Sequence, residues 1–207
     1  MTNFDYVEEK RKGGALNIRK TLRAPSIESI LKVLLAEPND LVVDASMAEG
    51  RYALALAFSF CEANGRGVVF ACDTNPDTLD DVDRISETFG VSQHVYPVRL
   101  DLMAPYRLPF REEQIDCILC VDRIPWKLKP VPYLEEFLRV LKPCGTVVIA
   151  ETSCRLRCSS AESVGSMIPP AQRRHFLNEA GFDIVTTINL GNYIWCERVM
   201  KSVVDFS

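Results

Sequence analysis

Short apolar runs alternate with amphipathic stretches along most of the chain. The runs are short and rich in valine and isoleucine, so they predict buried strands rather than helices. Between them, apolar residues recur at helical spacing, as at Ile27, Ile30 and Leu34. An alternation of strands and helices is typical of a doubly wound α/β sheet, whose parallel strands lie between two layers of helices.

Turn signals set the bounds of these elements. Asn64-Gly65, Gly90 and Gly181 each follow a helical stretch, and Gly191-Asn192 predicts a hairpin turn. The sheet is therefore predicted to have seven mostly parallel strands, with a C-terminal antiparallel hairpin. Strands are predicted at Leu41–Val43, Val68–Cys72, Val95–Leu100, Ile115–Val121, Thr146–Ala150, Phe182–Leu190 and Tyr193–Met200. Helices are predicted to begin near Pro25, Tyr52, Pro76, Pro132 and Pro170, the fourth ending at a turn over residues 142–145.

The segment from Asp40 to Arg51 predicts a binding edge. Its apolar run ends at Asp44, small residues follow, and a helix begins near Tyr52. A strand, a tight turn and a helix N-terminus together present backbone N–H groups and a carboxylate at the carboxyl end of a central strand. If the chain binds a nucleotide-like cofactor, we expect the cofactor here.

Length and charge bound the organisation. The chain has 207 residues, enough for one well-buried domain, which we place at residues 25–207. Residues 1–24 are polar and basic and predict an N-terminal arm or a lid over the site. The net charge of −4 argues against a nucleic-acid partner. No apolar run has membrane-spanning length and no signal-peptide pattern is present, so we expect a cytoplasmic protein of undetermined oligomeric state.

The eight cysteines do not predict a metal site or a disulfide framework. Cys117 and Cys120 lie three residues apart on a predicted strand, so their side chains should face opposite sides of the sheet. Cysteines in apolar segments are expected to pack as small, reduced hydrophobic residues. These are Cys61, Cys72, Cys144 and Cys196.

Several stretches together resemble class I S-adenosylmethionine-dependent methyltransferases, most closely the subgroup of ubiquinone and menaquinone biosynthesis enzymes (methyltransferase type 11). The resemblance covers about residues 26–200 and is most specific at Val140-Leu141-Lys142-Pro143. The other stretches that carry it are Leu41–Leu54, Val69–Pro76, Leu108–Phe110 with Ile115-Asp116, Phe137–Gly145 and His175–Phe182.

The resemblance implies a Rossmann-like fold, S-adenosylmethionine as cofactor and methyl transfer to a small-molecule acceptor. Asp73 would accept hydrogen bonds from the ribose hydroxyls, Asp101 would face the adenine amino group, and Leu102 would pack on the adenine ring. The backbone of the first turn would hold the methionine part of the cofactor. The full implied set is Asp44, Ser46, Ala48, Gly50, Asp73, Thr74, Asp101, Leu102 and Val121.

The first turn departs from the family pattern. Ser46 and Ala48 stand where the family has glycines, and only Gly50 is retained. The turn is similar to those of some RNA methyltransferases that lack these glycines. An alternative interpretation is a catalytically degenerate methyltransferase-like domain with a binding or structural role. A nicotinamide-dependent dehydrogenase is disfavoured, because that fold needs Gly-x-Gly-x-x-Gly and Ala48 occupies the middle position.

The methyl acceptor is not predicted by the sequence. Asp122, which follows the fourth strand, is the candidate catalytic base, and Arg123 and Trp126 are candidate substrate contacts. The His-His pair often present in the subgroup is absent, because the two histidines lie elsewhere. Cys154 and Cys158, in a predicted loop over residues 152–168, are candidates for a reactive pair that would methylate a thiol or metalloid.

Overall fold

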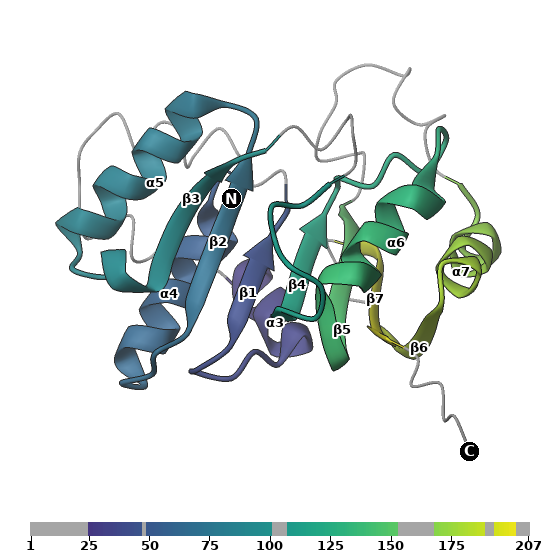
Figure 1. Ribbon diagram of the computed structural model, residues 1–207, viewed down its shortest axis with the longest axis horizontal. Helices are drawn as coiled ribbons and strands as arrows, with labels where there is room; N and C mark the ends of the chain where they lie inside the picture. The colour runs from purple at the N-terminus through teal and green to yellow at the C-terminus, as the bar shows by residue number, and fades with distance from the viewer. Residues whose placement is uncertain (1–24, 47–48, 101–106, 153–167, 189–192, 202–207) are drawn as a thin grey trace.

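The protein forms three layers, a central sheet with helices on both faces (Figure 1). The computed structural model describes residues 25–46, 49–100, 107–152, 168–188 and 193–201. Its strands are β1 (Leu41–Asp44), β2 (Val68–Asp73), β3 (Val95–Arg99), β4 (Ile115–Val121), β5 (Leu141–Thr152), β6 (Phe182–Ile188) and β7 (Tyr193–Lys201). Its helices are α3 (Pro25–Leu34), α4 (Arg51–Glu62), α5 (Pro76–Thr88), the 3₁₀ turn η1 (Ser92–His94), α6 (Pro130–Val140) and α7 (Pro170–Glu179).

The sheet has the strand order β3-β2-β1-β4-β5-β7-β6. Strands β1 to β5 are parallel, while β7 pairs antiparallel with both β5 and β6. This is the predicted Rossmann-like, mostly parallel sheet with an antiparallel C-terminal part. The strand order changes direction at β1, which lies between β2 and β4, and ligands of such sheets bind at this point.

Each face of the sheet has its own hydrophobic core. Helices α3, α4 and α5 pack on one face, where Phe60 and Ile85 are buried against the strands. Helices α6 and α7 cover the other face, where Phe137 and Leu177 are buried. Neighbouring residues of one strand go to different cores, since strand side chains alternate between faces. Cys117 and Cys120 accordingly lie in different cores, which confirms that their side chains face opposite sides of the sheet.

The α6–β5 junction differs from the prediction. Helix α6 begins at Pro130 rather than Pro132, because either proline fits a first turn whose N–H groups lack helical partners. The predicted turn over residues 142–145 lies inside β5, because Leu141 already pairs with Ile115 and Thr146 pairs with Cys117. The intervening residues form an irregularity in the strand, and Cys144 there is exposed rather than buried, with φ of 63°.

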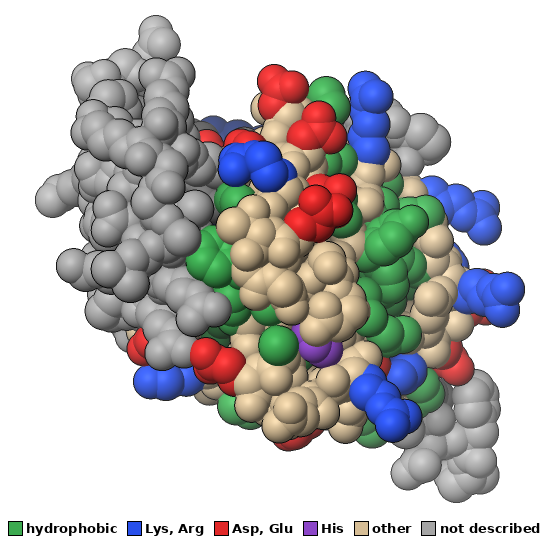
Figure 2. All heavy atoms as spheres, turned by 90° about the vertical axis from the view of Figure 1, so that its left-hand side faces the viewer, with side chains coloured by type: hydrophobic (Ala, Val, Ile, Leu, Met, Phe, Trp, Pro, Cys, Tyr) green, Lys and Arg blue, Asp and Glu red, His purple; other side chains and the backbone are tan. Residues whose placement is uncertain are grey.

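Between β3 and β4, the described residues include no helix. Leu108 and Phe110 instead pack beside the sheet, and Phe110 lies 4.8 Å from Phe70 of β2 between ring centroids. Tyr96 of the edge strand β3 is 63% exposed. Figure 2, viewed from the side of α5 and β3, shows hydrophobic side chains gathered at the surface between charged ones. Within the described ranges, no helix has the length and apolar character needed to cross a membrane.

Candidate functional site

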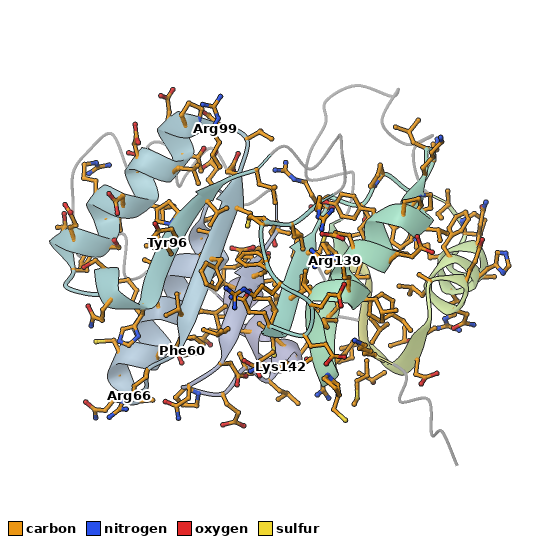
Figure 3. All side chains as sticks on the ribbon, viewed as in Figure 1. Phe60, Arg66, Tyr96, Arg99, Arg139 and Lys142 are labelled. Carbon is orange, nitrogen blue, oxygen red and sulfur yellow. The ribbon has the colours of Figure 1, made fainter. Side chains whose placement is uncertain are left out.

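The carboxyl ends of β1, β2 and β4 meet at one edge of the sheet. Figure 3 shows this edge at the end of the strands where Arg99 lies, whereas Arg66 and Lys142 lie at the opposite, amino edge. The predicted site residues that the structure describes all follow the carboxyl ends of these strands or lie at them.

Asp44, the last residue of β1, organises the turn that follows. Its carboxylate is 3% exposed, and Oδ1 accepts a hydrogen bond from the Ser46 N–H at 3.1 Å. Oδ2 accepts a second one from the Ala53 N–H in the first turn of α4, at 2.9 Å. Burial raises the pKa of Asp44, and these hydrogen bonds oppose the shift. Both carboxylate oxygens of Asp44 therefore accept backbone hydrogen bonds, which connect the turn and the first turn of α4 to the end of β1.

Ser46 joins the turn to β4. Its hydroxyl is buried, and Oγ accepts a hydrogen bond from the Val121 N–H at 3.1 Å. The preceding residue, Ala45, donates its N–H to the Leu119 carbonyl at 2.8 Å. The side chain that replaces a family glycine thus takes up a backbone donor at the end of β4. This role could not be read from the sequence, in which the two residues lie 75 positions apart.

Gly50 is required by its surroundings. It has φ of 72°, and a Cβ atom at this position would lie 2.2 Å from Cγ2 of Val82 in α5. The family resemblance places the backbone of this glycine at the methionine part of the cofactor. The structure adds two requirements for glycine here, the positive φ and the close approach of α5 to the turn.

Asp73 ends β2 at the same edge. It is half-buried, and Oδ1 accepts a hydrogen bond from the Asn75 N–H at 2.9 Å. Asn75 in turn caps α5 by accepting the Asp77 N–H at 3.0 Å, as the Asn-Pro signal predicted. Thr74 between them is exposed. The carboxylate of Asp73 is thus oriented by one backbone donor.

A pocket brings four of the predicted cofactor residues together: Asp44, Ser46, Gly50 and Asp73. The same pocket is lined by residues that sequence reasoning did not assign to the site. They are Ala71 and Cys72 of β2 and Thr78, Leu79 and Val82 of α5. Their signal in the sequence was that of ordinary core positions, because helix and strand residues next to a ligand share the apolar pattern of the core.

The segment after β4 contributes the candidate substrate residues. Asp122 has φ of 58° and donates its N–H to the Ala150 carbonyl of β5 at 2.9 Å. Trp126 is 7% exposed and donates its indole N–H to Glu151 Oε1 at 2.8 Å. Glu151, which the sequence did not single out, thereby fixes the ring in the core. Arg123 is half-buried, and its Nε and Nη2 atoms are fully enclosed.

Three buried thiols are held in their protonated form. Burial raises the pKa of Cys117 to about 11, and it also raises the pKa values of Cys72 and Cys120. Among the described residues, no group of histidine, cysteine and acidic side chains could hold a metal ion. His94 is buried and donates to the Gly67 carbonyl at 2.9 Å, while His175 lies on the surface of α7.

Other predicted site residues lie outside the described residues. They are Ala48, Asp101, Leu102, Cys154 and Cys158, together with the arm over residues 1–24.

Comparison with solved structures shows the same fold in several enzymes. A SAM-dependent methyltransferase from Aquifex aeolicus matches with a TM-score of 0.65 and 21% identity, over 91% of this chain and 99% of that one. Geranyl diphosphate C-methyltransferase from Streptomyces coelicolor matches with a TM-score of 0.66 and 13% identity, over 86% of this chain and 78% of that one. A Haloferax volcanii putative methyltransferase, solved in complex with the Trm112 activator, matches with a TM-score of 0.63 and 20% identity, over 81% and 72% of the chains.

Sequence comparison identifies the family. No curated protein sequence matches the chain significantly. The family described as methyltransferase domain matches residues 43–149, just over half of the 207-residue chain. This segment runs from β1 to β5 and contains the pocket residues Asp44, Ser46, Gly50 and Asp73. The chain therefore belongs to the methyltransferase domain family.

Proposed function

We propose that the protein transfers a methyl group from S-adenosylmethionine to a small-molecule acceptor. The observation that carries this proposal is the convergence of Asp44, Ser46, Gly50 and Asp73 on one small hollow at the carboxyl ends of β1 and β2. A nucleotide-like cofactor binds at this switch point in open α/β sheets. Two structural neighbours, geranyl diphosphate methyltransferases, were solved with S-adenosylmethionine or S-adenosylhomocysteine.

The residues present fit such a cofactor. Asp73 lies at the rim of the pocket and uses Oδ1 for the Asn75 N–H, so the rest of its carboxylate can accept hydrogen bonds from a ribose. The Ser46 Oγ atom already accepts a hydrogen bond from the Val121 N–H of β4, so the hydroxyl that lines the pocket has a partner within the protein. We assign the methionine part to the turn after Asp44, and the adenine to the end of β3 with Asp101 and Leu102.

Methyl transfer needs no side chain to activate the methyl group, because the sulfonium of the cofactor already does so. The protein must align the acceptor with that group and exclude water. A base is needed only for a neutral hydroxyl or a carbon acid. Asp122, held at the end of β4 by its N–H bond to Ala150, is our candidate for that base.

Calorimetry with S-adenosylhomocysteine tests the proposal. We expect micromolar binding to the wild type and a loss of tenfold or more in Asp73→Ala, because a charged acceptor of ribose hydrogen bonds is removed. Asp80→Ala, an exposed carboxylate of α5, is the matched control and should bind like the wild type. Absence of binding at millimolar ligand would refute the proposal and leave a degenerate binding domain.

A further inference from the structure

Arg123 carries buried donors that the protein leaves unsatisfied. Its Nε and Nη2 atoms are enclosed and have no hydrogen-bond partner within the part of the chain that the structure describes. A guanidinium keeps its charge at any physiological pH, and enclosed donors without acceptors are costly. The side chain as a whole is only half-buried, so part of it is open to solvent.

The guanidinium lies near the centre of the carboxyl edge. Asp44 pairs with Ala71 of β2 and Leu119 of β4, so the following residues, Cys72 and Cys120, flank Ala45 on the α6 face of the sheet. Burial raises the pKa of both thiols, and the positive charge of Arg123 opposes that shift at each. Arg123 follows β4 after one residue, Asp122, so it lies at this edge of the sheet, where its charge acts on thiols of both β2 and β4.

Three of the nearby carboxylates already accept hydrogen bonds from other groups. Asp44 and Asp73 act electrostatically on Cys72, and Asp44 and Glu151 act on Cys120. Asp44 is engaged by two backbone N–H groups, Asp73 by the Asn75 N–H and Glu151 by the Trp126 indole. The planar fork of a guanidinium matches a carboxylate, which can accept two parallel hydrogen bonds.

We propose that Arg123 is the receptor for a ligand carboxylate at this edge of the sheet. The inference rests on the proposed function, which offers two sources of that group: the methionine tail of the cofactor and an acidic acceptor. Arg123 is then a binding residue that sets ligand specificity. If the cofactor is the source, Arg123 adds a contact to its methionine carboxylate beside the turn after β1, in which Ser46 and Ala48 replace glycines.

The test compares ligands that differ only in the carboxylate-bearing part. Calorimetry is run on the wild type, Arg123→Met and Arg66→Met, the last an exposed arginine at the amino edge (Figure 3). S-Adenosylhomocysteine carries the amino-acid tail, and 5′-methylthioadenosine lacks it. If the cofactor is the source, Arg123→Met loses tenfold or more in affinity for the first and keeps its affinity for the second within twofold. Arg123→Lys should fall between, because it lacks the fork.

An acidic acceptor gives a different result. Arg123→Met then binds both nucleosides like the wild type but loses the binding of benzoate, the probe for an acidic acceptor. Benzamide, the neutral isostere of benzoate, should bind neither the wild type nor the variant. Because benzoate is also titrated without nucleoside, this arm remains informative if the wild type binds no nucleoside at all, which would refute only the proposed function.

Three results would overturn the inference. The first is an Arg123→Met protein that retains both S-adenosylhomocysteine and benzoate binding at wild-type strength. The second is a wild type that binds neither ligand. The third is a fall in melting temperature with equal losses for both nucleosides, which would mean that Arg123 balances the neighbouring acids of the folded protein. The inference instead expects an unchanged or raised melting temperature, because an unpaired buried charge is removed.

Discussion

Ser46 Oγ accepts the backbone N–H of Val121 at 3.1 Å, and this bond joins the turn after β1 to the end of β4. A glycine at position 46 could not make it. The substitution that looks like a loss in the sequence therefore adds a connection between two strands at the candidate site.

Replacing Ser46 by alanine should lower the free energy of unfolding by about 1–3 kcal/mol, because the buried Val121 N–H loses its acceptor. Urea unfolding followed by circular dichroism measures the change. Ser59→Ala, at an exposed position of α4, is the control and should change stability by less than about 0.5 kcal/mol. Equal effects of the two variants would show that the Ser46 hydroxyl does not connect the strands.

Gly50→Ala should be more destabilising than Gly90→Ala. Both positions have positive φ, 72° and 68°, which costs a residue with a Cβ about 1–2 kcal/mol. A Cβ at Gly90 meets nothing within 4 Å, whereas one at Gly50 meets Val82, which adds about 1–3 kcal/mol for overpacking. Denaturant unfolding compares them. In a double-mutant cycle, Val82→Ala should offset part of the Gly50→Ala loss, and strict additivity would contradict this account.

Asp44 should make stability depend on pH. Burial raises its folded-state pKa above the ordinary value of 3.8, so the folded protein holds this proton more tightly than the unfolded chain does. As the pH rises from about 4 through the raised pKa, wild-type stability should therefore fall relative to Asp44→Asn, which cannot titrate. Urea unfolding at a series of pH values from 4 to 8 gives this difference, with Asp80→Asn as control. A wild-type stability that instead rises with pH relative to Asp44→Asn would mean that the two N–H donors outweigh burial.

Trp126→Phe should weaken folding without weakening cofactor binding. The indole N–H satisfies Glu151 at 2.8 Å, and its loss should cost about 1–3 kcal/mol in unfolding free energy. Affinity for S-adenosylhomocysteine should stay within twofold, because the ring is buried in the core. Tyr96→Phe, at an exposed position, is the control. Reduced affinity at unchanged stability would contradict this account and place Trp126 in contact with the cofactor.

The strands could be predicted because each is a short apolar run with a polar boundary, as from Ile115 to Val121. The start of β5 could not, because Lys142 to Gly145 carries the signal of a turn, and only pairing with β4 keeps the chain in the sheet there. Local turn chemistry is ambiguous when a neighbouring strand supplies hydrogen bonds from outside the segment.

Within the site, residue types at strand ends were predictable and their partners were not. Asp44 and Asp73 lie at one pocket, as their positions after apolar runs indicated. The partners of Ser46 and Gly50 come from β4 and α5, far along the chain, and no local pattern identifies them. Trp126 is a candidate substrate contact in the sequence, and its acceptor Glu151, which lies 25 residues away, could not be predicted from it.

The contact between Gly50 and Val82 also constrains how this sequence can diverge. A side chain can appear at position 50 only after position 82 has become smaller, so the two positions should change together among homologous sequences. Since α5 begins just after Asp73, the packing of this helix on the turn also links position 50 to the acid at the end of β2.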